Sequence, residues 1–133
     1  MKAIVLQKNT TSSTAAGVDA IRNFWADKGI EKSALKIIDG SGLSPANRLT
    51  TKSLVQLLQY AKDKVWFTSF KNALPEMNGI KMKDGYISGV RSYAGYVNAA
   101  TGEMFTFAFI VNNFDGSAAT VRQKMYSVLN LLK

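Results

Sequence analysis

Two short stretches of the sequence combine residue types that could carry out a reaction. The first, DGSGLSPANRLT at 39–50, is a loop rich in glycine and small polar residues that also contains Ser44, Asn47 and Arg48. The second contains a Lys-Asp-Gly triplet at 83–85. Because the chain has neither histidine nor cysteine, any catalysis would use serine, lysine, tyrosine or carboxylate groups. We predict no metal site and no cofactor.

The Lys-Asp-Gly triplet lies in a strand-like run over 80–98 that has Gly89 and Gly95 in its interior. Interior glycines weaken a strand and often mark a place where a ligand or another chain approaches the backbone. One interpretation is therefore the wall of a binding cleft. The alternative is a twisted hairpin strand in which the glycines only provide curvature.

The charge of the chain favours an anionic partner. The net charge is +8, and six lysines against two acidic residues lie between Lys52 and Lys83. Such a field attracts nucleic acid, an acidic polymer or a substrate carboxylate. The alternative is a solvated lysine-rich surface without a ligand.

Hydrophobic periodicity predicts four helices. We expect them over 15–28, after a cap at Thr50 or Thr51, over 67–73, and after a cap at Asp115 or Ser117. The apolar faces of the first and last helices are expected to hold Val18, Ile21, Phe24 and Trp25, and Val121, Met125, Val128 and Leu132.

Strands are expected over 35–38, 80–98 and 104–111, and the almost wholly apolar third segment is predicted to be a central strand covered on both faces. The last two strands are adjacent and form a hairpin. The fold is therefore predicted to be α+β, an antiparallel sheet flanked by helices. The length of 133 residues suggests that 1–133 is a single domain or a piece of one.

The beginning of the chain shows no recognisable export signal. The apolar run from Ala3 to Leu6 is too short for the core of a signal peptide. We therefore expect any export signal to lie outside this chain. No run of the sequence approaches the length of a membrane-spanning helix.

Several motifs follow one another in an order typical of one family. They are STAAG at 13–17, DGSGLS at 39–44 followed by an Asn-Arg pair, Lys-x-Gly at 83–85, and AGYV at 94–97. In this the chain resembles the C-terminal part of the penicillin-binding D-alanyl-D-alanine carboxypeptidase/endopeptidases of the dacB type, class C of low molecular mass. The resemblance implies part of a penicillin-binding/β-lactamase-like transpeptidase domain.

The activity that this resemblance implies is acyl transfer to an active-site serine, with Ser-x-x-Lys, Ser-x-Asn and Lys-Thr-Gly as the catalytic motifs. It also implies a peptidoglycan stem peptide or a β-lactam as ligand of the parent enzyme, a periplasmic or cell-envelope location, and no nucleic acid. Preference for carboxypeptidase or endopeptidase action stays open.

Three residues receive catalytic roles from the resemblance. Ser44 matches the serine of the second motif, and Lys83 matches the lysine of the third. Asn47 is the nearest asparagine, although it stands three positions after Ser44 instead of two.

The resemblance assigns substrate binding to residues around the same motifs: Asp84, Gly85, Tyr86 and Arg48. Asp84 replaces the usual threonine or serine, whose hydroxyl helps to hold the substrate's terminal carboxylate in the family. An aspartate would repel that carboxylate at neutral pH unless a neighbouring cation neutralised it. The cations that could do so are Lys83, Arg48 and Arg91.

The nucleophile motif has one match, Ser33 and Lys36, and we interpret it as a coincidence. Catalytic serines of this class begin a helix, whereas these residues enter a predicted strand, where positions three apart point to opposite faces. The expected account is a C-terminal fragment that lacks the nucleophile half and is inactive alone. The missing half would leave apolar surface that favours a homodimer.

Two other functions remain possible from the residues alone. One is a basic α+β module that holds an anionic polymer, peptidoglycan or nucleic acid, through Lys81, Lys83, Arg91 and the tyrosines 86, 93 and 96. Strand parity weakens it, because it places Tyr86 and Tyr96 on one face and Tyr93 on the other. The other is a non-catalytic peptidoglycan- or partner-binding remnant that reuses the cleft.

Overall fold

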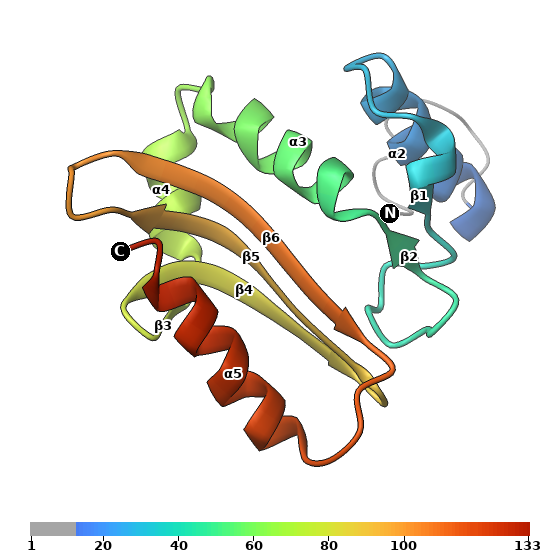
Figure 1. Ribbon diagram of the computed structural model, residues 1–133. Helices are drawn as coiled ribbons and strands as arrows, with labels where there is room; N and C mark the ends of the chain where they lie inside the picture. The colour runs from blue at the N-terminus through green and yellow to red at the C-terminus, as the bar shows by residue number, and fades with distance from the viewer. Residues whose placement is uncertain (1–12) are drawn as a thin grey trace. The chain divides into compact units, whose positions relative to one another are not determined.

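The computed structural model describes residues 13–133, and the chain divides into two compact units, 1–53 and 54–133 (Figure 1). Each unit has its own secondary structure. The expectation about a signal peptide concerns residues 1–12 and lies outside the described residues.

The second unit is built on a four-stranded antiparallel sheet with the order β3-β4-β5-β6. Its strands are β3 (Glu76–Met77), β4 (Ile80–Ile87), β5 (Val90–Asn98) and β6 (Met104–Asn112). β4, β5 and β6 follow one another as a meander in full register.

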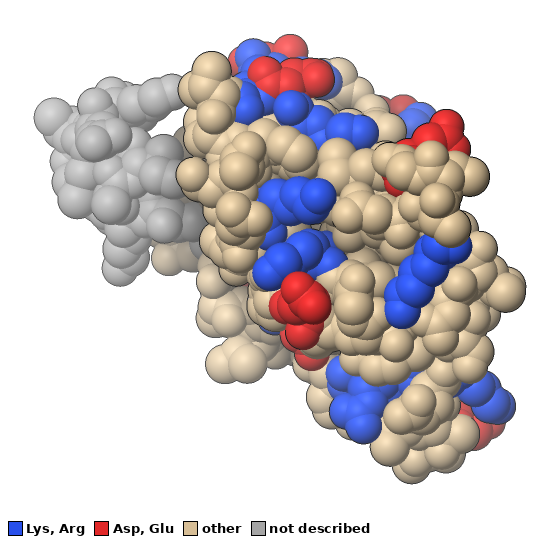
Figure 2. All heavy atoms as spheres, turned by 90° about the vertical axis from the view of Figure 1, so that its left-hand side faces the viewer, with Lys and Arg blue, Asp and Glu red and all other residues tan. Residues whose placement is uncertain are grey.

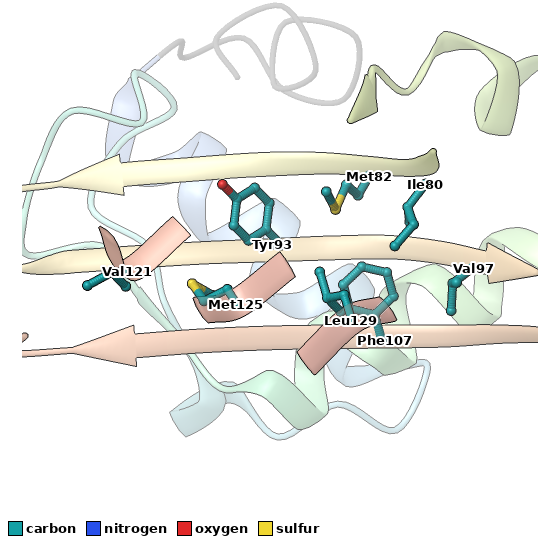
Figure 3. Close-up of a cluster of buried hydrophobic side chains, with 8 residues drawn as sticks. All are labelled: Ile80, Met82, Tyr93, Val97, Phe107, Val121, Met125 and Leu129. Atoms are coloured by element: carbon teal, nitrogen blue, oxygen red, sulfur yellow. The ribbon is translucent and has the colours of Figure 1, made fainter. Parts of the chain in front are cut away.

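Helix α5 (Ala118–Asn130) covers one face of this sheet. Its buried residues Val121, Met125 and Leu129 meet side chains of β4, β5 and β6, as Figure 3 shows. The members from the strands are Ile80, Met82, Tyr93, Val97 and Phe107. Burial of this apolar surface provides most of the stabilisation that holds α5 on the sheet.

Helices α3 (Thr51–Lys62) and α4 (Phe67–Ala73) supply the contacts to the other face. The hydroxyl of Tyr96 donates to the Leu58 carbonyl at 2.7 Å, and the ring of Phe67 lies edge-on to that of Tyr96 at 5.1 Å. Helices thus lie against both faces of an antiparallel sheet, which confirms the predicted α+β class.

The strand predicted over 80–98 is instead two strands joined by a turn. Gly89 has φ +72°, a left-handed conformation that glycine adopts without strain, and Ile87 pairs with Val90 across the turn. Reversal of the chain also changes the side-chain parity, so Tyr86 shares a face with Tyr93 and not with Tyr96. The predicted grouping of the tyrosines was therefore wrong.

Two further expectations about the core are corrected. Within the described residues β6 lies at the edge of the sheet, with Phe105 42% exposed, and β5 takes a central position. A long apolar run therefore did not identify the central strand. In α5 the buried residue after Met125 is Leu129. The predicted core residues Val128 and Leu132 are instead exposed, Val128 by 50%. The spacing of 4 and 4 keeps Leu129 on the face of Val121 and Met125.

The β3–β4 turn is connected to the end of α5. Asn78 and Gly79 both have positive φ, 53° and 66°. Asn78 Nδ2 donates to Asn130 Oδ1 at 2.9 Å, and Lys133 Nζ donates to the Asn78 carbonyl at 2.6 Å. The turn therefore has side-chain partners from the last part of the chain.

The first unit contains α2 (Thr14–Ala26), the 3-10 helix η1 (Lys32–Ala34), and a small sheet of β1 (Leu35–Lys36) and β2 (Arg48–Leu49). Ser13 caps α2, since its side chain accepts from the Ala16 N–H, and Thr50 Oγ1 accepts from the Ser53 N–H at the start of α3. The predicted cap at Thr50 or Thr51 is confirmed at Thr50.

Burial in the first unit is limited to a few residues. Gly17, Val18, Ile30, Leu35 and Ser53 are buried. The predicted apolar face of α2 was wrong at Phe24, which is 43% exposed and packs edge-on against Trp25 at 5.0 Å.

Candidate functional site

The loop between β1 and β2 is held by two polar side chains at its base. Asp39 Oδ1 accepts from the Ser41 N–H at 3.0 Å, from Ser41 Oγ at 2.9 Å and from Asn47 Nδ2 at 3.2 Å. These bonds lower the pKa of Asp39, the hydroxyl of Ser41 being the largest cause. The carboxylate therefore stays ionised and keeps the loop closed.

Asn47 closes the same loop from its other end. Its Oδ1 accepts from the Ile38 N–H at 2.7 Å and from the Asp39 N–H at 3.3 Å, while its Nδ2 donates to Asp39. Both ends of the amide are thus engaged with the chain itself. In this arrangement Asn47 positions the loop, and its predicted catalytic role stays a prediction.

Ser44 lies in the turn of this loop and is half-buried. Its Oγ accepts from the Ala46 N–H at 3.3 Å, and its carbonyl accepts from the Asn47 N–H at 3.1 Å. No described group accepts the hydroxyl proton. A serine held in this way can pass a proton to or from a bound ligand.

The Lys-Asp-Gly triplet lies on β4, where Asp84 is paired with two cations. Lys83 Nζ lies 3.0 Å from Asp84 Oδ1 and also donates to the Asp84 carbonyl at 2.8 Å. Arg91 Nη2, from β5, lies 3.6 Å from Asp84 Oδ2. The hydrogen bond from Lys83 is the largest cause that lowers the pKa of Asp84, and the charges of Lys83 and Arg91 add to it. Two of the three predicted neutralising cations therefore meet this carboxylate.

Arg91 connects the triplet to two tyrosines. Its guanidinium lies 5.5 Å from the ring of Tyr86 and 5.3 Å from that of Tyr93, and it donates to the Tyr93 hydroxyl from Nε and Nη2 at 3.1 and 2.9 Å. The sequence did not single out this role of Arg91. Arg91 is the cross-strand partner of Tyr86, and prediction of this strand register from the sequence would have indicated that the guanidinium lies near that ring.

The edge of β4 beside the triplet is open within the described residues. β3 pairs only with Ile80 and Lys81, so the strand from Lys83 to Ile87 has a partner only on the β5 side. Gly85 faces Ser92, whose Oγ lies 2.6 Å from the position that a Cβ at Gly85 would take. An open strand edge can add an extended peptide by backbone hydrogen bonds.

The site residues divide between the two units. Ser44, Asn47 and Arg48 belong to the first, and Lys83, Asp84, Gly85 and Tyr86 belong to the second. Within the second unit the structure brings Lys83 and Asp84 together and leaves Tyr86 57% exposed. In the first unit, Asp39 and Ser41 are structural residues of the loop that the sequence analysis did not single out. The Asp-x-Ser spacing of an Asx turn would have indicated them.

Ser33 and Lys36 are arranged differently from the expectation. Ser33 lies in η1 and Lys36 in β1, yet both line the same pocket. Ser33 Oγ donates to Glu31 Oε2 at 3.4 Å, and no hydrogen bond joins the two residues in the described structure. A nucleophile of this kind would need to stand at the beginning of an α-helix, and Ser33 does not.

The three tyrosines of the alternative binding module do not form a platform for stacked bases in the described part of the chain. Tyr93 and Tyr96 are buried, so only Tyr86 of the three tyrosines is exposed. On the face displayed in Figure 2, lysine and arginine side chains stand in separate groups with uncharged surface between them. Nucleic-acid binding usually needs a continuous basic stripe with accessible aromatic rings.

Among residues 13–133 no group of three acidic side chains could hold a metal ion. The described helices also include none with the length and apolar character needed to cross a membrane.

Comparison with known families assigns the chain. The profile of the D-Ala-D-Ala carboxypeptidase 3 (S13) family matches residues 1–79 and 76–131. The chain belongs to this family. The match includes the 39–50 loop, the Lys-Asp-Gly triplet and the strand that ends in AGYV.

Relatives in this family support the assignment. The chain is 28% identical to a D-alanyl-D-alanine carboxypeptidase of Actinomadura sp. strain R39, over 85% of this chain and 25% of the relative. It is 27% identical to the carboxypeptidase DacB of Mycolicibacterium smegmatis, over 88% of this chain and 30% of that protein. The chain thus spans about a quarter to a third of the curated relatives that it matches.

A solved structure agrees with the fold. The crystal structure of penicillin binding protein 4 (dacB) from Haemophilus influenzae matches with a TM-score of 0.77 and 23% identity, over 91% of this chain and 32% of that chain. The likeness confirms the predicted penicillin-binding-protein-like fold. A second structure of the same protein, which carries a β-lactam, matches with a TM-score of 0.76, 23% identity, and 91% and 34% coverage.

Proposed function

We propose that this chain is the C-terminal part of a serine-type D-Ala-D-Ala carboxypeptidase/endopeptidase that acts on peptidoglycan peptides in the periplasm or cell envelope. The observation that carries the proposal is Lys83 beside the open edge of β4. An extended peptide substrate would pair with that edge, and the ammonium of Lys83 would stabilise negative charge that develops on the substrate. Family membership supports the same reaction, acyl transfer to a serine.

Ser44 and Asn47 complete the proposal from the first unit. The Ser44 hydroxyl, whose proton no described group accepts, would carry a proton towards the leaving amine. Asn47 would act by holding the loop that presents Ser44, because its amide is engaged with Ile38 and Asp39. Arg48, exposed on β2, would attract the anionic substrate.

Asp84 would alter substrate recognition in this enzyme. A carboxylate at this position repels a terminal substrate carboxylate, and it also engages Lys83 and Arg91, the cations that would otherwise attract that group. Replacement by threonine removes the negative charge and restores the hydroxyl. We expect Asp84→Thr to raise acylation by a D-Ala-D-Ala mimic about ten-fold in a chain that contains the nucleophile.

We further propose that these 133 residues alone do not become acylated, because the single Ser-x-x-Lys match, at Ser33, does not begin an α-helix. Labelling with a fluorescent penicillin tests this. The chain alone should stay unlabelled, and a longer parent with an upstream Ser-x-x-Lys should be labelled. Label on the chain alone that Ser33→Ala abolishes would contradict the proposal.

Lys83 itself is tested in the same longer parent. Lys83→Gln should reduce the acylation rate by about 10²-fold, since one preorganised charge is lost from the site. Lys62→Gln, an exposed lysine at the end of α3, removes the same charge elsewhere and should label as the parent does. Equal labelling of both variants would show that β4 does not form the site.

A further inference from the structure

The first unit contains a pocket of about 330 Å³ that the acyl-transfer proposal does not use. Its wall is formed by the last part of α2, by η1 and by the segment that leads from β1 into the 39–50 loop. The lining residues are Arg22, Lys32, Ser33, Lys36, Ile37 and Ile38.

The charges around this pocket are unbalanced. Arg22, Lys32 and Lys36 line it, and Arg48 is the cross-strand partner of Lys36 in the small sheet. No acidic residue lines the pocket, and none of these four cations forms an ion pair with another described residue. Like charges on directly opposite strand positions destabilise a sheet, so an anion bound here would relieve repulsion.

Arg22 has a buried donor without a partner. Its Nε is buried and makes no hydrogen bond within the described chain, while its Nη2 reaches the Lys32 carbonyl only at 3.5 Å. A buried N–H of this kind costs free energy unless a ligand or water accepts from it. The planar fork of a guanidinium suits an anion with two oxygens in one plane, a carboxylate.

The remaining walls restrict what carries that anion. Ile37 and Ile38 supply apolar surface beside the cations, which suits a small aliphatic group next to the carboxylate. The volume is at the lower end of ordinary ligand pockets, so it accepts one or two residues of a peptide and not a folded polymer. Glu31, which accepts from Ser33 Oγ, is the nearby acid that would disfavour a ligand of higher negative charge.

We infer that this pocket binds the free carboxylate end of a short peptide through Arg22, with Lys32 and Lys36 adding positive charge. The site is connected to the second motif, because the Ile38 N–H that leads out of the pocket donates to Asn47 Oδ1 at 2.7 Å. A ligand that contacts Ile38 would therefore act on the residue that holds the Ser44 loop closed.

The experiment is a titration of the 133-residue chain with N-acetyl-D-alanyl-D-alanine and with its C-terminal amide, at constant ionic strength. Two-dimensional NMR follows the Nε–H resonance of Arg22 and the amide of Ile38. The free acid should shift both resonances, and the amide should shift neither, because it lacks the second oxygen and the charge. A shift of equal size with the amide would overturn the inference.

Matched variants separate the pocket from general charge. Arg22→Gln should weaken binding of the free acid at least about ten-fold, as expected for loss of a charge-assisted hydrogen bond. Lys124→Gln, on the exposed side of α5, lowers the net charge equally and should bind as wild type. If the two variants lose the same affinity, the pocket has no specific role. Lys32→Gln, at an exposed position, should also weaken binding and keeps the test valid if Arg22→Gln unfolds.

The choice of D-alanine in the probe rests on the proposed function. The inference that the pocket binds a carboxylate does not, because it rests on the lining residues and on the unpartnered Nε of Arg22. N-acetyl-L-alanyl-L-alanine and a short oligonucleotide complete the design. If the L-peptide alone binds through Arg22, the pocket is upheld and its link to peptidoglycan peptides is contradicted. If the oligonucleotide alone binds, the peptide inference is wrong.

Discussion

The β-sheet of the second unit and the 39–50 loop of the first are stabilised by different interactions. On the sheet, eight buried residues from three strands and α5 form one apolar cluster. In the loop, the order comes from hydrogen bonds that Asp39 and Asn47 make with backbone and side-chain groups. The sheet therefore distributes its stability over many contacts, whereas the loop depends on a few polar atoms.

The difference has a consequence for substitutions. Truncation of one side chain in a packed cluster lowers the global free energy of unfolding. A loop near the surface can open by itself while the rest of the chain stays folded. Substitutions in the sheet should therefore change the free energy of global unfolding, whereas substitutions in the loop should mainly change local amide hydrogen exchange. The four predictions below run from the largest expected loss of stability to the smallest.

The largest effect is expected for Gly95→Ala in β5. A Cβ at this position would meet the Lys81 carbonyl oxygen and lie 2.6 Å from Met82 Cα, both on the neighbouring strand. Because backbone atoms cannot move aside without breaking the ladder, we expect a loss of more than about 4 kcal/mol, enough to prevent folding. Circular dichroism and urea unfolding measure this.

Gly89→Ala is the control for that prediction. Gly89 has open space around its Cβ position, and its only obstacle is a φ of +72°. The expected loss is about 1 kcal/mol, as for alanine in a left-handed turn. Similar losses for both variants would contradict the view that Gly95 serves the close approach of β4 and β5.

The next effect concerns α5. Met125→Ala removes a side chain that is 1% exposed at the centre of the cluster, and we expect a loss of about 3 kcal/mol. Val128→Ala, three residues later at 50% exposure, should cost less than about 1 kcal/mol. Thermal unfolding of the two variants compares them directly. A larger loss at Val128 would restore the helix face that the sequence predicted.

Tyr96→Phe tests the hydrogen bond that joins the other face of the sheet to α3. Loss of the hydrogen bond to the Leu58 carbonyl should cost about 1.5 kcal/mol at pH 7. Burial raises the pKa of Tyr96 to about 12, so between about pH 10 and pH 12 the unfolded state releases this proton while the folded state retains it.

The stabilisation by the Tyr96 hydroxyl is therefore complete below pH 10 and decreases as the pH rises towards 12. Urea unfolding at pH 7, 10 and 12 should show the difference between wild type and Tyr96→Phe shrinking over the last interval. A difference that stayed constant would mean that the hydroxyl ionises normally in the folded chain.

The smallest effect on global stability is expected for Asn47→Ala. The variant leaves the N–H groups of Ile38 and Asp39 without their acceptor, yet these groups lie near solvent, so the global loss should stay near 1 kcal/mol. Amide hydrogen exchange at Ile38 and Asp39 should accelerate at least ten-fold. Asn72→Ala, on the exposed side of α4, should change neither rate.

The sequence predicted those parts of the fold that depend on periodic apolar residues or on capping. The helices after Ser13, Thr50 and Ser117 begin where a hydroxyl can accept a backbone N–H, and each was found. The Ser88–Gly89 turn was missed because its flanking residues continue the strand pattern on both sides, although a Ser-Gly pair is itself a turn signal.

Other features depend on partners that lie far away in the sequence. The position of β6 at the edge of the described sheet depends on which strands lie beside it, and apolar content alone does not contain that information. The pairing of Asp84 with Arg91 depends on the register of β4 and β5, which the turn at Gly89 sets. The motifs identified the family, whereas the geometry of Lys83 and Asp84 required the structure.

The contacts between the end of α5 and the β3–β4 turn have a mechanical consequence. Asn130 and Lys133 attach that end of the helix to Asn78 through hydrogen bonds of 2.9 and 2.6 Å. The opposite end begins at Ser117, whose side-chain bonds stay within the helix itself. If a force separates α5 from the sheet, the Ser117 end should detach first. The end that is bonded to the β3–β4 turn at Asn78 should detach last.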